Sequence, residues 1–360
     1  MAYTTIDDPS LYFRVKTYSG SSSDGNAVTW DETHANMQPD WLWLKNRTAA
    51  QEHWLADSVR GTGKFLESNS GNVESSDGAS GLASFDTNGF TLNDSARTNR
   101  NTMVGWGWKA ETSFSNSAGA NGADLASSGS YNRDAGFSIV TFTGNATANQ
   151  QIYHGLNSVP VWMVLKNRTN SNNESWSVYH QSIGNTKKIT LDTTATPSTS
   201  NEFWEDTTPT STVFTVGRQD AVNGSGNTHV VYCFSEVKGY SKFTSFTGNG
   251  SSDGPFVYLG FRASFVIIKR TDTTANWQMY DNKRDGYNGP GYPAKGNESL
   301  RPNTSEAESS ATGYDIDILS NGIKLRNSSS TMNSSGASHI VMAFAESPFV
   351  TSTGIPTTAR

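Results

Sequence analysis

The hydrophobic positions of this chain come in short runs, and longer stretches rich in Gly, Asn, Ser and Thr separate them. In the run at 103–108, Val104, Trp106 and Trp108 fall on one side of an extended chain, with glycines between the tryptophans on the other. Alternation of this kind, bounded by turn residues, is typical of β-strands. Long stretches of strong helix formers are missing from the sequence. The pattern predicts an all-β protein built from antiparallel sheets.

The runs recur in the same order three times, which indicates three copies of one unit. Each unit has a turn motif, then an apolar strand closed by lysine, a strand that begins with tryptophan, a short strand and a closing aromatic strand. The turn motifs are FTGN at 142–145 and 246–249, with a degenerate YSGS at 18–21. The lysine-closed strands are 41–45, 162–166 and 265–269, the tryptophan strands begin at Trp54, Trp176 and Trp277, and the closing strands are 103–108, 229–234 and 339–344.

The repeat divides the chain into three units. Unit 1 covers residues 1–110, unit 2 covers 135–240 and unit 3 covers 241–360, with a Ser, Gly and Asn-rich connector at 111–134. A unit of about 100 residues with several strand signals predicts three tandem antiparallel β-sandwiches, jelly-roll-like in type. The connector is either flexible or an ordered insertion that wraps a neighbour.

The lysine-closed strands are apolar on both faces, with Trp41 and Trp43 on one and Leu42 and Leu44 on the other. A strand of this kind is expected in the middle of a sheet with both sides covered. Either loops or a neighbouring unit would cover the second side.

Charge and composition exclude several classes of protein. A net charge of −6 and the lack of a cluster of Lys and Arg argue against a nucleic-acid partner. No apolar run is long enough to span a bilayer, and the polar start of the chain, 1–9, does not look like a secretory signal. We therefore expect a protein made in the cytoplasm, without a membrane span and, with a single cysteine, without an internal disulfide.

The residue types that usually carry chemistry do not form a recognisable constellation. The six histidines show no metal-site spacing. His229 and His339 occupy the place that Met103 has in unit 1, which favours packing over metal binding. Cys233 matches Gly107 and other small residues, so we interpret it as a small packed side chain. The sequence predicts no catalytic residues, no metal and no cofactor.

One carboxylate pair keeps an enzymatic alternative open. Asp315 and Asp317 alternate along a predicted strand and would share a face, as the two acids of a glycoside hydrolase do. A solvated polar face explains the same pattern.

Aromatic residues without a counterpart in the other units are candidates for ligand contact, because exposed rings stack on sugars. Those in repeat-equivalent positions are expected in the core. The ligand-contact candidates are Trp30, Trp204, Tyr287 and Tyr292.

The motifs of unit 1, read in order, resemble a known family. They are TTIDDP at 4–9, PDWLWLKNR at 39–47, DSVRG at 57–61, SFDTNGF at 84–90 and GWGWKA at 105–110. This order resembles a domain of structural proteins in marine phages, especially cyanophages, where it looks like a concanavalin/laminin-G-type jelly roll. Unit 2 lacks the DSVRG motif. The resemblance implies a virion component and brings no catalytic residues with it.

The leading hypothesis is a non-enzymatic structural protein on the outside of a phage particle, either a tail fibre or a capsid fibre or decoration. Its expected partners are copies of itself, other virion proteins and, for a host-contacting fibre, host surface polysaccharide. The segment from Met1 to Tyr12 is a candidate docking arm. The alternatives are a lectin-like carbohydrate-binding module and a polysaccharide-degrading enzyme.

Overall fold

The computed structural model describes residues 3–76, 80–284, 298–310 and 313–357. Strands form almost all of its regular structure, and the helical elements are single turns. The predicted all-β class is confirmed. The short helical elements are η1 (Pro9–Leu11), η3 (Ala120–Gly122), α1 (Asn201–Trp204) and α2 (Asp220–Asn223).

Each unit contains a principal antiparallel sheet with one recurring strand order. The first strand of the unit pairs with the closing strand, which pairs with the lysine-closed strand, which pairs with the strand after it. In unit 1 the order is β1 (Phe13–Ser19), β7 (Thr102–Trp108), β3 (Trp41–Asn46) and β4 (Trp54–Asp57). In unit 2 it is β10 (Phe137–Thr143), β17 (Thr228–Phe234), β12 (Trp162–Asn167) and β13 (Ser177–His180). In unit 3 it is β18 (Ser241–Thr247), β24 (Ser338–Pro348), β20 (Phe261–Arg270) and β21 (Gln278–Asp281).

Unit 2 has further strands at both edges of its principal sheet. The connector at 111–134 provides β8 (Thr112–Asn116) and β9 (Ser127–Asn132), which pair with each other and continue the sheet beyond β10. The connector is therefore an ordered insertion, the second of the two alternatives. At the opposite edge lie β14 (Lys187–Thr190) and β15 (Ser198–Thr199).

A smaller antiparallel sheet accompanies each principal sheet, and a local core cluster lies in each unit. The pairing makes each unit sandwich-like. The smaller sheets are β2 (Asn26–Thr29), β6 (Gly89–Leu92) and β5 (Leu82–Asp86) in unit 1; β11 (Gln150–Tyr153) and β16 (Val213–Val216) in unit 2; and β19 (Phe256–Tyr258), β23 (Gly322–Leu325) and β22 (Ile316–Leu319) in unit 3.

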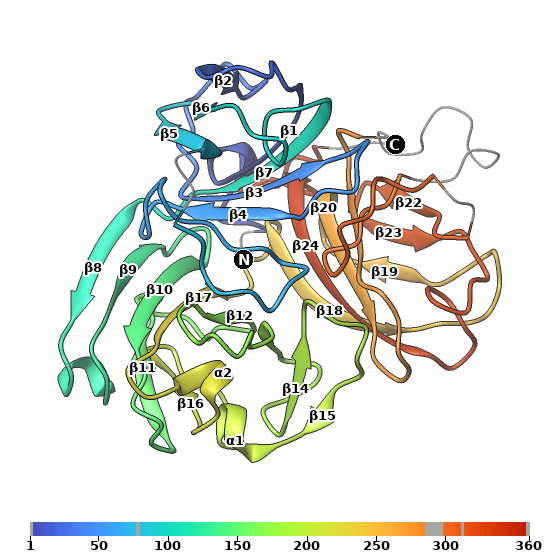
Figure 1. The fold of residues 1–360 in the computed structure, drawn as a ribbon. Helices are drawn as coiled ribbons and strands as arrows, with labels where there is room; N and C mark the ends of the chain where they lie inside the picture. Colours follow the sequence, from blue (N-terminus) through green and yellow to red (C-terminus); the bar gives the residue numbers. More distant parts are fainter. Residues whose placement is uncertain (1–2, 77–79, 285–297, 311–312, 358–360) are drawn as a thin grey trace.

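The three units surround one shared core (Figure 1). The last aromatic residue of each closing strand meets its counterparts there: the ring centroids of Trp108 and Phe344 are 5.6 Å apart, as are those of Phe234 and Phe344. Trp108 and Phe234 are 6.5 Å apart. The three units therefore pack against one another and are not independent domains, because these aromatic faces are buried only when all three units are together.

The shared core explains why the lysine-closed strands are apolar on both faces. Trp41 and Trp43 belong to the central cluster, and Leu42 and Leu44 belong to the local cluster of unit 1. The neighbouring units, rather than loops, cover the second face.

The recurring turn motif needs its glycine because the turn packs closely against a segment that contains a buried asparagine. Asn145 donates its backbone N–H to Oδ1 of Asn223, which is fully buried. A Cβ on Gly144 would lie 2.4 Å from the carbonyl oxygen of Gly224, so this close approach excludes any larger residue. The equivalent pairs of turn glycine and buried asparagine are Gly20 with Asn99 and Gly248 with Asn333.

The described part of the N-terminal segment packs against units 2 and 3. Thr4 donates its hydroxyl to the carbonyl oxygen of Lys238, and Ile6 belongs to the central core. Asp7 accepts hydrogen bonds from Ser352 near the other end of the chain. From residue 3 onward the segment is therefore part of the folded body, and its role as a docking arm stays a prediction.

Candidate functional site

The buried lysines that close the apolar strands hold neighbouring units together. Each is fully buried, and each donates hydrogen bonds from Nζ to a carbonyl of its own unit and to one of another unit. Burial lowers the pKa of each amine from 10.5 to about 8. The acceptors in the other units are Ser305 for Lys45 (3.2 Å), Gly71 for Lys166 (2.8 Å) and Thr194 for Lys269 (3.0 Å).

A ring N–H opposite each lysine makes a second set of contacts between the same pairs of units. Trp43 donates Nε1–H to Nδ1 of His53 (2.8 Å), so His53 carries its proton on Nε2 and donates it to the carbonyl oxygen of Arg301 (3.1 Å). Two tryptophans donate in the equivalent way, Trp176 to Glu67 (2.8 Å) and Trp277 to Thr190 (3.1 Å).

This set corrects the alignment of the tryptophan strands. Leu44 lies opposite Trp54, whereas Leu165 lies opposite Ser177. His53, and not Trp54, is therefore the counterpart of Trp176 and Trp277. Trp54 instead stacks on Phe65 inside the local core of unit 1.

The DSVRG motif of unit 1 forms a buried ionic cluster at the boundary with unit 2. Asp57 accepts hydrogen bonds from the Tyr232 hydroxyl (2.8 Å) and from Arg60 Nε (2.6 Å). Arg60 also donates to Glu74 (2.9 Å), which accepts two further bonds from Arg168 of unit 2. Burial would lower the pKa of Arg60, but Asp57, Tyr232 and Glu74 together outweigh burial and raise that pKa. The motif thus joins unit 1 to unit 2 through paired, buried charges.

The boundary between unit 3 and unit 1 repeats this arrangement. Asp281 accepts from Trp106 Nε1 (3.1 Å) and from Arg284 Nε (2.6 Å). Glu308 then joins Arg284 (3.1 Å) to Arg47 of unit 1 (2.8 Å). Burial raises the pKa of Glu308, but hydrogen bonds from Arg47 and the nearby guanidinium charges lower it to about 2.

In the part of the chain that the structure describes, the boundary between units 2 and 3 has no such ionic cluster. Met342 takes the place of Trp106 and Tyr232 and has no proton to donate. Opposite it, His180 stands in place of the aspartate and Ile183 in place of the arginine. Thr271, whose backbone N–H bonds to the start of the closing strand as that of Arg47 does, stands in place of the second arginine. The polar group and its partners are therefore replaced together, as the cost of an unpaired buried charge requires.

The buried histidines of the closing strands serve packing. His229 stacks on Phe142 with ring centroids 4.9 Å apart, and His339 stacks on Phe246 at 4.6 Å. Burial lowers the pKa of His229 to about 4, so the ring is neutral at physiological pH. Burial also raises the pKa of the Cys233 thiol, which is fully covered.

Two of the predicted ligand-contact residues are core residues. The side chains of Trp30 and Trp204 are 2% and 1% exposed. Trp30 donates its ring N–H to the Met37 carbonyl (2.8 Å), and its ring fills the space that Gly107 leaves empty. Trp204 packs edge-on against Tyr179. The prediction of a sugar-stacking surface at these two positions is wrong, because neither ring has a face open to solvent.

The other two candidates, Tyr287 and Tyr292, lie outside the described residues. The carboxylates of the enzymatic alternative are described, and both residues are about nine-tenths buried or more: Asp315 is 6% exposed and Asp317 is 5% exposed. Asp317 forms an ion pair with Arg326. This is the geometry of a structural contact, and it adds no support to the enzymatic alternative. Among the described residues, no group of three or more His, Cys, Asp or Glu is placed to hold a metal ion.

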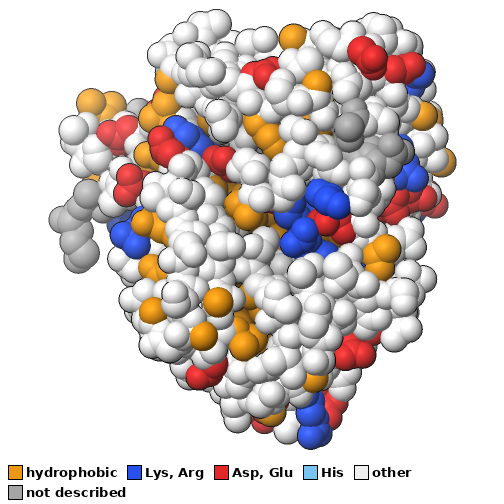
Figure 2. Space-filling view, turned by 60° about the vertical axis from the view of Figure 1, so that its left-hand side comes forward, with side chains coloured by type: hydrophobic (Ala, Val, Ile, Leu, Met, Phe, Trp, Pro, Cys, Tyr) orange, Lys and Arg blue, Asp and Glu red, His pale blue; other side chains and the backbone are white. Residues whose placement is uncertain are grey.

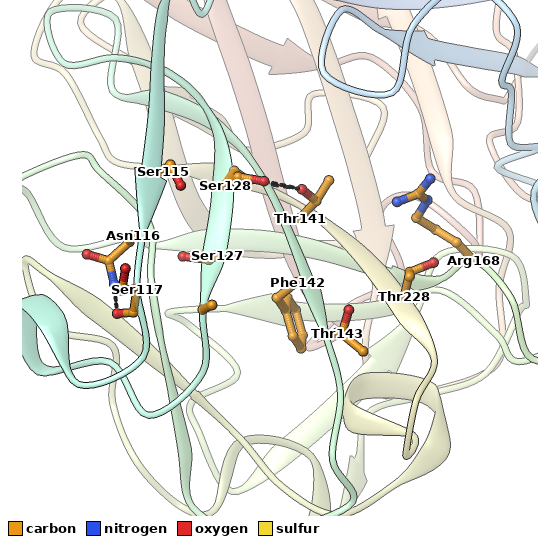
Figure 3. A pocket seen from close by; sticks show the side chains of 11 residues that line it. Ser115, Asn116, Ser117, Ser127, Ser128, Thr141, Phe142, Thr143, Arg168 and Thr228 are labelled. Carbon is orange, nitrogen blue, oxygen red and sulfur yellow. Dashed lines mark hydrogen bonds between the residues drawn. The ribbon is translucent and has the colours of Figure 1, made fainter.

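A polar groove of about 320 Å³ lies over β8, β9 and β10 (Figure 3). Seven hydroxyl side chains line it, and two of them, Ser128 and Thr141, are neighbours on β9 and β10 and bond to each other (3.1 Å). Arg168 at its end is already bound by Glu74, and Phe142 in its wall is 4% exposed. The groove, which we call the serine–threonine groove, offers hydrogen bonds but no exposed ring. The hydroxyl residues are Ser115, Ser117, Ser127, Ser128, Thr141, Thr143 and Thr228.

A second depression, of about 220 Å³, lies where the N-terminal segment, β18 and β19 meet. We call it the tyrosine cleft, because Tyr3 and Tyr258 line it and their side chains are 57% and 59% exposed. Lys238 stands over the Tyr3 ring (5.6 Å to its centroid), and Lys242 pairs with Glu236 (2.6 Å). The other lining residues are Gly239, Ser241, Leu259, Gly260, Phe349 and Val350.

Tyr258 is not among the contact residues predicted from the sequence. Phe256 and Tyr258 are exposed on β19 while Val257 between them is buried. That alternation is typical of an edge strand with one aromatic face turned outward, and it is the sequence pattern from which Tyr258 could have been predicted.

Comparison with known proteins gives one match. A family model described as "Domain of unknown function (DUF7483)" matches residues 8–348, a span that crosses all three units. No curated protein and no solved structure matches the chain. In the described residues, no helix has the length and apolarity needed to cross a membrane. The match covers most of the chain and treats the three units as one domain, in agreement with their shared core, so the chain belongs to the DUF7483 family.

Proposed function

We propose that this protein is a non-enzymatic structural component on the outside of a phage particle, where it contacts other virion proteins. The observation that carries the proposal is the use made of its buried ionisable side chains. The buried lysines and the Asp–Arg–Glu clusters lie at boundaries between units and are occupied in joining them. An enzyme would direct such ionisable side chains at a substrate. Here they bond one unit to the next.

The surface supports the same proposal. On the side that carries β8 and β9, Figure 2 shows mostly uncharged polar side chains and backbone, with charges in small mixed groups. Such a surface suits a protein that stays soluble in an external medium while contacting neighbours through limited patches. The chain reaches this state with one cysteine, which is buried and free, so its rigidity comes from the core and the boundary contacts.

The resemblance of the unit 1 motifs to marine phage structural proteins supports a place on the virion. Either a tail fibre or a capsid decoration fits a three-unit body, and contact with host surface polysaccharide would fit the first. A polysaccharide-degrading activity finds no support in the surroundings of Asp317.

The test is cryo-electron microscopy of purified particles, combined with mass spectrometry of particles washed in high salt. We expect the chain to remain bound and a three-lobed density to lie on the exterior. Density that projects from the tail or a vertex would assign host attachment, and density flat on the capsid would assign stabilisation. If the washed particles do not contain the chain, the proposal is wrong.

A further inference from the structure

We propose that the outer edge of β8 pairs with the same edge of a second copy of this protein, so that two sheets join across a twofold axis. The inference deepens the partner contacts of the proposed function, and it rests on that function only for its biological setting.

The position of β8 is the first argument. β8 lies at the outer margin of the eight-stranded sheet (Figure 1), and among the described residues no strand pairs with its far side. Thr112, Ser113 and Ser115 are exposed, and Phe114 is partly exposed. An edge strand presents a row of backbone N–H and C=O groups, with which another extended chain can pair.

Other edges of the principal sheets are protected against such pairing. Natural proteins protect sheet edges with short strands, with charged side chains or with a covering segment. β15 has only two residues, and β1 carries Arg14 and Lys16. Further backbone covers two more edges, that of β4 through a bridge from Leu66 and that of β21 through a bridge from Leu300.

Two side chains of unit 2 occupy the edge of β18. Phe243 donates its backbone N–H to Glu236 (3.2 Å), and its carbonyl oxygen accepts a hydrogen bond from Gln181 (2.6 Å). By contrast, β8 has five residues with neither charge nor proline, and its pairing with β9 is without a bulge. In the described part of the chain, β8 is thus the principal-sheet edge that lacks these protections.

The hairpin of β8 and β9 is an addition to the repeat. In the described residues, the equivalent sheets of units 1 and 3 end at β1 and β18. Those units complete their cores without such a hairpin, so the fold of a unit does not require it. An added hairpin that ends in an open edge suits a contact between molecules.

The sequence of β8 favours a second copy as the occupant. Residues 112–116 read TSFSN, which is nearly the same in both directions. Antiparallel pairing about Phe114 therefore places Ser113 of one copy opposite Ser115 of the other, and the two phenyl rings opposite each other. Such a contact uses the same patch on both copies, as the twofold dimers that are commonest among homo-oligomers do.

The length of β8 limits the strength of the contact. Stable interfaces bury about 1,200–2,000 Å² in total, which is more than one pair of short strands provides. We therefore expect the dimer to be weak in dilute solution and to be favoured where many copies are held close together.

The experiment is sedimentation-velocity ultracentrifugation of the full-length chain at increasing concentrations, up to about 1 mM, the dissociation constant of a weak complex. We expect an equilibrium between monomer and dimer. The double variant Ser113→Lys, Ser115→Lys places lysine opposite lysine twice, and it should raise the dissociation constant about tenfold or more.

The double variant Ser113→Lys, Ser115→Glu is the matched control. It changes the same two positions but places lysine opposite glutamate twice, so the dimer should be kept or strengthened. Both positions are exposed, and melting curves establish that each variant is folded. The double-lysine variant also brings the net charge of −6 closer to zero, so general repulsion between chains would not explain a lost dimer.

Three outcomes would overturn the inference: a chain that stays monomeric over the whole range, a dimer that survives the double-lysine variant, or equal weakening by both variants. The first would leave the edge to an extended segment of another virion protein. The failures of the two proposals are distinguishable. Sedimentation of the isolated chain says nothing about the particle, and a chain missing from purified particles would leave its self-association unchanged.

Discussion

Lys166 of unit 2 donates a hydrogen bond from Nζ to the carbonyl oxygen of Gly71 in unit 1, over 2.8 Å. Lys45 of unit 1 reaches unit 3 in the same way, and Lys269 of unit 3 reaches unit 2. The three contacts form a closed cycle, so each unit is fastened to both of its neighbours. The cycle, with the aromatic centre that it surrounds, is the basis of the predictions below.

The lysines should make the protein more stable as the solution becomes mildly alkaline. An unfolded lysine keeps its proton to about pH 10.5, whereas these three lose it near pH 8 in the folded state. Between these values the unfolded state binds more protons, so the free energy of unfolding rises with pH, by at most about 1.4 kcal/mol per pH unit for each lysine. Urea unfolding from pH 8 to just below the ionisation of ordinary tyrosines, at about pH 10, measures this slope.

Lys269→Met tests the origin of that slope. The variant should lose about a third of the rise, since it removes one of three equivalent groups, and at neutral pH it should be less stable because two carbonyls lose their donor. An unchanged slope would contradict the assignment to the lysines.

Acid should destabilise the protein over the range in which unfolded histidine takes up protons. Burial lowers the pKa of His154, His180 and His229 from 6.5 to about 4, and those of His53 and His339 are also lowered. As pH falls below 6.5 the unfolded state binds more protons, so the free energy of unfolding falls, by up to about 1.4 kcal/mol per pH unit for each histidine. Guanidinium unfolding at several pH values between 6.5 and 4 measures it.

His229→Met isolates one of these contributions. Met103 already fills the equivalent place in unit 1, so the variant should fold and show an acid slope smaller by one proton. A variant with the full parental slope would show that His229 does not take part.

The turn glycine should tolerate no added methyl group. Gly144→Ala places a Cβ against the Gly224 carbonyl and should cost about 3 kcal/mol or more, because the backbone must move. Gly63→Ala is the control, since its Cβ would meet nothing within 4 Å and its effect should be small. Thermal unfolding of the two variants decides. Equal stability of both would refute the role given to the close approach.

The ionic cluster at the first boundary should be costly to break and cheaper to remove as a whole. Arg60→Leu leaves Asp57 buried without its cation, whereas Glu74 keeps Arg168, and the variant should cost about 3–5 kcal/mol. The double variant Asp57→Asn, Arg60→Leu should cost less than the single one, because it leaves no unpaired charge. Urea unfolding of both variants tests this. A double variant that is less stable than the single one would mean that the cluster stabilises the boundary by more than charge balance.

Sequence patterns predicted the all-β class and the doubly apolar strands because alternation and burial are local properties of a strand. They did not predict how the tryptophan strands of the three units align. Tryptophan fits either face of such a strand, so an alignment that is wrong by one residue still looks correct. His53 takes the place of Trp176 because both donate a ring N–H to a carbonyl of another unit. The two residue types differ, so the sequence does not show that they are equivalent.

The candidate site was harder to predict for a similar reason. Trp30 was a contact candidate because it has no counterpart in the other units, but its burial depends on Gly107, far along the chain. Tyr3 and Tyr258 are brought together by the fold, and their separation of more than two hundred residues gives no sign of it. The strands β8 and β9 depend on pairing with β10, which their Ser and Gly-rich composition does not show.

The closed cycle within one chain also has a consequence for what the molecule can display. A ring of three identical subunits must repeat every surface three times, because symmetry copies each change. Here the extra strands β8 and β9 occur on one unit, and the tyrosine cleft lies beside another. The protein thus combines the closed contacts of a threefold ring with three different sides. A partner that binds one side therefore determines which side faces away from it.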